Sequence, residues 1–130
     1  MRTGRHVSYR ALLAVLAAVV GLAACAEVPP PAPPETRSGF PERGAKLISQ
    51  YGCGGCHTVP GVDRAEGLVG PPLTRFGSRS YIAGELPNNE ENLRRWIQDP
   101  RAVEPGTAMP DLGVSETDAR DIAAYLFTLD

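Results

Sequence analysis

The sequence predicts an all-α fold, in which three main helices and long loops surround a bound group that completes the hydrophobic core. Helical periodicity is present in three segments, and no segment alternates apolar and polar residues as a half-buried strand would. The 130 residues include only three Phe, four Tyr and one Trp. A globular part with so few large apolar side chains would have a marginal core unless a bound group supplied apolar surface.

The first helix is predicted to begin at Pro41, because proline suits a first helical turn, and to stop at Gly52. In this segment, small or apolar side chains recur at helical intervals: Gly44, Leu47, Ile48 and Tyr51. The following residues, 58–88, are rich in Gly and Pro without sustained periodicity, so they are predicted to form mostly loop.

The second helix is predicted between Asn89, a candidate cap, and Pro100, which ends it. It presents three apolar residues on one face: Leu93, Trp96 and Ile97. The third begins at Ser115, which is spaced with Asp118 like an N-cap pair, and runs nearly to the end of the chain. Its apolar positions form an amphipathic face: Ile122, Ala123, Tyr125, Leu126 and Leu129.

The N-terminus, residues 1–24, is predicted to be a lipoprotein signal peptide. Three arginines precede the uncharged run "ALLAVLAAVVGLAA", which as a helix would span about 21 Å. That is short of the roughly 30 Å hydrocarbon core of a bilayer and typical of a secretory signal. The run ends in "LAAC", which resembles the lipobox of bacterial lipoproteins and predicts lipidation of Cys25. The alternative is an ordinary cleavage site with Cys25 as a free thiol.

Residues 25–39 are predicted to be a lipidated cysteine followed by a proline-rich, semi-rigid tether, and residues 40–130 the globular domain. These features predict a membrane-anchored lipoprotein of the bacterial cell envelope that faces the periplasm. Thirteen Lys and Arg stand against fifteen Asp and Glu, so there is no basic surplus for binding nucleic acid.

The stretch "CGGCH" contains Cys53, Cys56 and His57. C-x-x-C-H is the attachment sequence of c-type haem: both thiols form thioethers to the macrocycle, and the histidine then ligates the iron. Two alternatives are a thioredoxin-like redox pair, which needs a βαβ context, and a structural zinc site, which needs a fourth ligand. The helical pattern argues against the redox pair, and the shortage of further Cys and His argues against the zinc site. The prediction is one haem c, held covalently.

Met109, in the loop "PGTAMP", is the candidate for the sixth iron ligand. Removal of the signal peptide leaves it as the one methionine and leaves no second histidine. His/Met ligation would raise the reduction potential relative to stronger-donor axial pairs and leave no vacant site for a substrate, as an electron carrier requires. The alternative is a surface or packing methionine. The iron would then be five-coordinate, and the protein a haem peroxidase or gas-binding protein.

With "CGGCH", "VGPPL" and "PGTAMP" in this order, residues 40–130 resemble a class I cytochrome c. The stretch "GELPNNEENLRRWIQDPRAVEPGTAMPDLG" is similar to the cytochrome c domain fused to subunit II of some haem-copper oxidases. This resemblance implies the class I cytochrome c fold. The 130 residues show no counterpart of the copper-binding domain of those fusions, which implies a free-standing lipoprotein version.

The resemblance also assigns roles to individual residues. Pro71 would accept the Nδ1–H of the haem-ligating histidine through its carbonyl, and Leu73 would pack on the haem face. Arg79 and Thr107 would contact haem propionates, and Trp96 would pack near the methionine side. Three of these roles have simpler alternatives: an ordinary turn at Pro71, a solvated side chain at Arg79 and core packing of Trp96. A further pair, Gly44 and Tyr125, matches the point where the first and last helices of the family cross.

The function implied is single-electron transfer without chemical turnover of a substrate, so no enzymatic activity is expected. The expected redox partners are a cytochrome bc-type complex or periplasmic dehydrogenase as donor and a terminal oxidase as acceptor. An alternative is a tightly bound haem subunit of an oxidase or dehydrogenase. The lysine collar of mitochondrial-type carriers is missing, because Lys46 is the one lysine, so docking is expected to be largely apolar around the haem edge.

Overall fold

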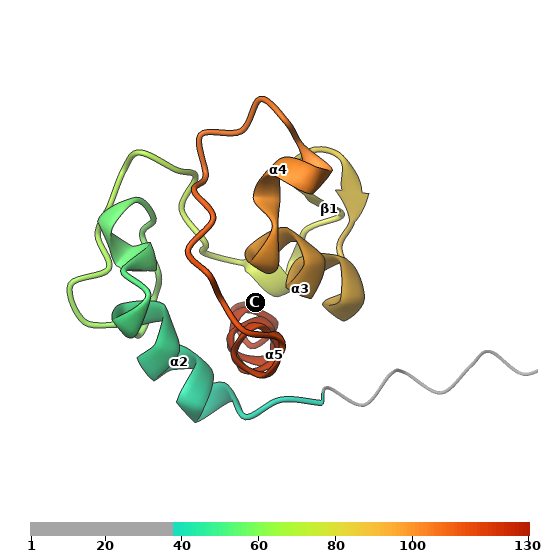
Figure 1. Cartoon of the computed structure of the whole chain (residues 1–130). Helices are drawn as coiled ribbons and strands as arrows, with labels where there is room; N and C mark the ends of the chain where they lie inside the picture. The colour runs from blue at the N-terminus through green and yellow to red at the C-terminus, as the bar shows by residue number, and fades with distance from the viewer. Residues whose placement is uncertain (1–37) are drawn as a thin grey trace, which may run out of the picture. The chain divides into compact units, whose positions relative to one another are not determined.

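The computed structural model describes residues 38–130 (Figure 1). They form four helices: α2 (Pro41–Gln50), α3 (Glu90–Gln98), α4 (Pro100–Val103) and α5 (Glu116–Leu126). Two 3₁₀ turns, η1 (Cys53–Gly55) and η2 (Phe76–Ser78), and a ribbon of strands β1 (Tyr81–Ile82) and β2 (Leu86–Pro87) lie between them. The prediction of an all-α fold with long loops is confirmed.

The predictions for the N-terminus fall almost entirely outside the described residues. They are the signal peptide over 1–24, the lipidation of Cys25 and the tether over 25–39, of which the structure describes only the last two residues. From residue 38 onward, no helix has both the length and the apolar character needed to cross a bilayer.

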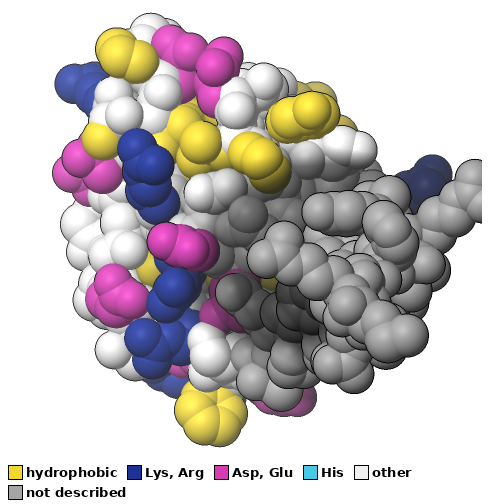
Figure 2. Space-filling model, turned by 90° about the vertical axis from the view of Figure 1, so that its right-hand side faces the viewer, with side chains coloured by type: hydrophobic (Ala, Val, Ile, Leu, Met, Phe, Trp, Pro, Cys, Tyr) yellow, Lys and Arg dark blue, Asp and Glu magenta, His cyan; other side chains and the backbone are white. Residues whose placement is uncertain are grey.

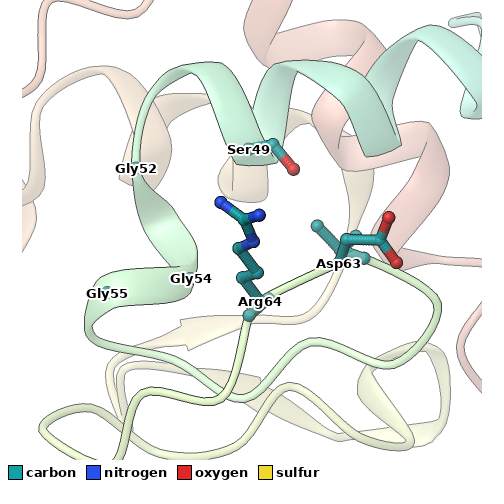
Figure 3. Close-up of a pocket in the computed structure, with 8 residues that line it drawn as sticks. Ser49, Gly52, Gly54, Gly55, Asp63 and Arg64 are labelled. Carbon is teal, nitrogen blue, oxygen red and sulfur yellow. The ribbon is translucent and has the colours of Figure 1, made fainter.

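Helix α2 begins at Pro41 and ends two residues before Gly52, whose φ of +72° is the left-handed conformation that glycine adopts readily. The last turn of α2 contains no basic residue. A loop supplies one instead. Figure 3 shows Arg64 pointing its guanidinium toward the end of α2 at Ser49, across a recess of about 330 Å³. A cation there faces the negative end of the helix dipole.

Side-chain caps begin the three later helices. Asn89 accepts from the N–H of Asn92 at α3, and Ser115 accepts from the N–H of Asp118 at α5, as the sequence predicts. Pro100 needs a correction. It does follow the end of α3, but it also opens α4, because Asp99 caps the new helix by accepting from the N–H of Ala102 at 3.0 Å.

The β1–β2 ribbon is also a correction, because the sequence pattern predicts no strand. Tyr81 pairs with Pro87 and Ile82 with Leu86, in antiparallel register. Two residues per strand are too few for an alternating pattern to be recognised. The turn between them places Ala83 and Gly84 at φ values of +53° and +79°.

Helices α2 and α5 pack closely at Gly44. A Cβ built there would lie less than 3.0 Å from the carbonyl oxygen of Asp121 and from Cβ of Tyr125. The helix crossing implied by Gly44 and Tyr125 is therefore present. The buried core extends from this crossing to α3 through large aliphatic side chains: Leu47, Ile48, Leu93, Ile97, Ile122 and Leu126.

A polar network joins the same two helices. Asp121 is only 2% exposed, accepts from the backbone N–H of Phe40 at 2.9 Å and pairs with Arg43. Arg43 also pairs with Asp118, which accepts from the hydroxyl of Tyr51 at 2.8 Å. Both ends of α2 are thus tied to α5. No sequence motif identifies this network.

The network predicts a loss of stability in acid. The hydrogen bond from Tyr51 lowers the pKa of Asp118 below its ordinary 3.8, helped by hydrogen bonds from Ser115 and Arg43 and opposed by partial desolvation. A lowered native pKa contributes stability that is present above the ordinary value and is lost as pH falls through the native one. Urea unfolding at neutral pH and near pH 3 should show a smaller acid loss in Tyr51→Phe than in the wild type. Equal acid losses would contradict this role of Tyr51.

Candidate cofactor site

A cavity of about 520 Å³ is bordered by α2, α3, α5 and three loops. The structure brings all nine residues predicted to contact the cofactor to its wall: Cys53, Cys56, His57, Pro71, Leu73, Arg79, Trp96, Thr107 and Met109. Much of the remaining wall is aliphatic and comes from the three longer helices: Ile48, Leu93, Ile97, Ile122 and Leu126.

The C-x-x-C-H turn is formed by a local hydrogen-bond pattern. Cys53 opens η1, and its carbonyl accepts from the N–H groups of both Cys56 and His57, at 3.2 and 3.0 Å. This compact turn directs all three side chains to one cavity. Cys53 and Cys56 do not form a disulfide, and burial raises the pKa of the Cys53 thiol.

The imidazole of His57 is oriented by the next loop. Its Nδ1 lies 2.7 Å from the carbonyl oxygen of Pro71, which leaves Nε2 as the nitrogen available to a metal. Two backbone hydrogen bonds hold this loop, from Gly70 to the Cys56 carbonyl and from Leu73 to the Thr58 carbonyl, each 2.8 Å long. The contact between Pro71 and His57 is the one that the family resemblance implies.

Gly70 leaves room for this imidazole, because a Cβ there would lie less than 3.0 Å from three ring atoms of His57. Gly70→Ala is expected to push the ring away from the Pro71 carbonyl. If His57 ligates a haem iron, a weaker Nδ1–H···O bond would make the imidazole less basic, so the ferric form would lose stability and the reduction potential would rise. A tenfold change in the equilibrium constant of reduction would shift the reduction potential by about 59 mV, because one electron is transferred. Redox titration measures it, with Pro71→Ala, which keeps the carbonyl, expected to change less. An unchanged potential in Gly70→Ala would contradict the prediction.

Arg79 is engaged with the protein backbone. Its Nη2 donates to the carbonyl oxygens of Pro72 and Thr74, the latter at 3.0 Å, and its guanidinium lies 5.3 Å from the ring centroid of Phe76. The side chain also lines the cavity, so the same residue both supports the loop around Pro71 and presents a positive charge to the site.

Two wall residues that the sequence did not single out are exposed. Val69 is 80% and Leu112 40% exposed, and Leu68, beside Val69, is 87% exposed. Glu104 is another wall residue without an assigned role, and it is charged. Val69 is the first residue of "VGPPL", and Glu104 and Leu112 lie close to "PGTAMP", but the family resemblance assigned no role to any of them.

The wall residues fit a haem. Two thiols and an imidazole come from one turn, a thioether sulfur comes from a distant loop, and apolar side chains from three helices surround them. Comparison with known proteins agrees: the family model described as "Cytochrome c" matches residues 41–130. The chain belongs to the cytochrome c family.

Three curated relatives are similar to this cytochrome c, and all are named cytochrome c oxidase subunit 2. The protein of Alkalihalophilus pseudofirmus is 42% identical over 88 residues, which cover 67% of this chain and 25% of the relative. That of Bacillus sp. strain PS3 is 44% identical over 66 residues, 49% of this chain and 18% of the relative. That of Bacillus subtilis strain 168 is 38% identical over 88 residues, which cover 63% of this chain and 25% of the relative.

The matched region is thus about a quarter of these relatives or less. The resemblance to the cytochrome c domain of oxidase subunit II is confirmed, as is the fold expected of a cytochrome c. Membership of the family implies a covalently attached haem c, for which this cytochrome c has the C-x-x-C-H sequence at Cys53, Cys56 and His57.

Proposed function

We propose that this cytochrome c is a single-electron carrier, with one haem c attached to Cys53 and Cys56 and ligated by His57 and Met109. The observation that carries the proposal is the shared cavity. It collects the attachment turn and Met109, from segments far apart in the chain, on one largely aliphatic wall. When bound, the haem supplies an iron that alternates between ferric and ferrous states.

The chain's own residues suit a carrier better than an enzyme. Pro71 orients the imidazole, and the aliphatic wall lines the same cavity as both proposed ligands. Because His57 and Met109 would both ligate the iron, no coordination position would be left for a substrate. Leu73 and Trp96 are assigned to packing against the haem. Arg79 and Thr107 are assigned to its propionates, in addition to the backbone contacts that both side chains make.

The exposed side chains Val69 and Leu112, which line the cavity, form its apolar rim, and we assign electron exchange to this rim. Where described side chains are visible in Figure 2, basic and acidic ones are interspersed. Docking through this apolar rim would depend only weakly on salt, because contacts between apolar side chains are not screened by ions.

Lipidated Cys25 and the tether over 25–39 would hold the carrier at the membrane, on the periplasmic side of a bacterial envelope, with residues 1–24 removed as the signal peptide. A tether raises the effective concentration of the carrier near membrane-bound partners and so compensates for weak docking. Because the relatives are oxidase subunits, a terminal oxidase is the proposed acceptor. The proposed donor is a cytochrome bc-type complex or a periplasmic dehydrogenase.

The same relatives favour a second candidate, a tightly bound haem subunit of an oxidase or dehydrogenase complex, since their matching domain is part of a subunit. Purification from membranes in mild detergent separates the two candidates. A carrier would be recovered free of oxidase subunits, whereas a subunit would co-purify with its complex in a constant ratio.

The visible spectrum of the purified, haem-loaded protein tests the ligation. The ferric wild type is expected to show the weak far-red band of methionine-to-iron charge transfer, and Met109→Ala is expected to lose it. A wild type that lacks the band and binds carbon monoxide readily when reduced would contradict the carrier proposal. It would favour a peroxidase or gas-binding protein.

A further inference from the structure

The segment that carries Met109 is positioned by short-range hydrogen bonds. In the described part of the chain, each hydrogen bond made by residues 105–113 goes to a residue of 104–113. The bonds therefore do not attach this segment directly to α2, α3 or α5. Whatever fixes Met109 relative to the cavity must enter through the ends of the segment or through side-chain packing.

Glu104 is the residue through which α4 meets this segment. Its N–H donates to the carbonyl of Pro100 at 2.9 Å, which makes it the C-cap of α4. Pro100 is fully buried, so this end of the connection is anchored in the core. The carbonyl of Glu104 accepts from the N–H of Thr107 at 3.0 Å, and its carboxylate Oε1 accepts from the N–H of Gly106 at 2.8 Å.

Thr107 continues the connection to the proposed ligand. Its Oγ1 accepts from the N–H of Met109 at 3.1 Å. The hydrogen bonds thus run from α4 to Glu104, then through the turn at Gly106 and Thr107 to the backbone of Met109. A hydroxyl that accepts this bond still has its own proton to donate, so contact with a propionate is compatible with it.

Gly106 permits this arrangement. A Cβ built there would lie 3.1 Å from Oε1 of Glu104, closer than side chains ordinarily approach. The carboxylate therefore sits directly over the turn. Charge-assisted hydrogen bonds from backbone N–H groups to a carboxylate are stronger than neutral ones, so this bond dominates the turn.

We infer that Glu104 is a positioning residue for Met109: its carboxylate fixes the turn at Gly106 and Thr107 and so holds the methionine at the cavity. The inference rests on the proposed ligation of iron by Met109. Loss of the carboxylate would let the segment move away more often. An added ligand could then replace the sulfur more readily, because its apparent affinity follows the fraction of open molecules.

The test is an imidazole titration of the ferric, haem-loaded full chain. Binding is measured as the loss of the far-red methionine band. Glu104→Ala is expected to bind imidazole roughly tenfold more tightly than the wild type, since it loses a hydrogen bond to a charged acceptor. Glu104→Gln keeps an oxygen that can accept from Gly106 and should lie near the wild type. Thr107→Val, which loses the acceptor for Met109 N–H, should shift in the same direction as Glu104→Ala.

Asp111→Ala is the matched control. Asp111 also accepts a 2.8 Å bond from a backbone N–H two residues further on, that of Gly113, but it is not connected to the N–H of Met109. The Asp111→Ala substitution removes one negative charge from the same segment, as Glu104→Ala does. The imidazole affinity of this variant is expected to stay near that of the wild type.

Two results would overturn the role of Glu104 alone: a wild-type affinity in Glu104→Ala, or an equal gain in Asp111→Ala. A different result would overturn the proposed ligation itself, namely a wild type without the far-red band whose imidazole affinity is unchanged in Met109→Ala.

Discussion

Gly44→Ala should lower the free energy of unfolding by about 3 kcal/mol. Gly44 is where α2 crosses α5, and an added Cβ would overlap the backbone carbonyl of Asp121 and approach Cβ of Tyr125. Neither neighbour is the flexible end of a side chain, so relief requires the two helices to separate. Separation would weaken the packing of Ile48 and Ile122, both buried beside the cavity. Urea unfolding of the haem-loaded protein, followed by circular dichroism, measures the loss.

Gly84→Ala is the control for this substitution. Gly84 has a φ of +79°, and a Cβ there would meet nothing within 4 Å. Its substitution should cost only the strain of a left-handed residue, about 1 kcal/mol. Similar losses in the two variants would show that the crossing of α2 and α5 tolerates a methyl group, contrary to the prediction.

The second large effect is expected for Asp121→Ala, with a loss of about 2–3 kcal/mol in the free energy of unfolding. The carboxylate is almost completely buried, and its removal leaves the N–H of Phe40 without its acceptor and Arg43 with Asp118 as its remaining partner. Asp121→Asn keeps an oxygen for Phe40 but loses the charge, so its loss should be smaller. Chemical unfolding at neutral pH provides the comparison.

Glu116 offers a matched carboxylate on the same helix. It also has two arginine partners, Arg94 at 3.1 Å and Arg120 at 3.5 Å, but its side chain is 61% exposed. Exposed ion pairs contribute little, so Glu116→Ala should cost only about 0.5 kcal/mol. If Glu116→Ala destabilised the protein as much as Asp121→Ala, burial would not be the reason for the importance of Asp121.

The parts of this protein that could be predicted from its sequence are those formed by residues close together in the chain. The C-x-x-C-H turn needs five consecutive residues, and each predicted cap depends on one side chain and a backbone N–H three residues further on. The periodicity of α2, α3 and α5 reports which face of each helix is buried. The family resemblance added the pairing of Pro71 with His57, which no local pattern would indicate.

The remaining features depend on residues that meet only after the helices have packed. Arg43 finds Asp118 and Asp121, Arg64 reaches the end of α2, and the β1–β2 ribbon pairs two residues with two. Such partners are chosen by the crossing of α2 and α5 and by the course of the loops, not by residue type or spacing.

Glu104 shows that a short-range contact can also escape the sequence pattern. In the sequence it is one of fifteen acidic residues. In the structure its carboxylate accepts from Gly106, two residues further on, and its backbone connects α4, where Pro100 is buried, to the turn before Met109. The sequence by itself determined the C-x-x-C-H turn and the helix caps, because these need only neighbouring residues. Tertiary packing decided the helix crossing and the cavity wall, because their partners are far apart in the chain.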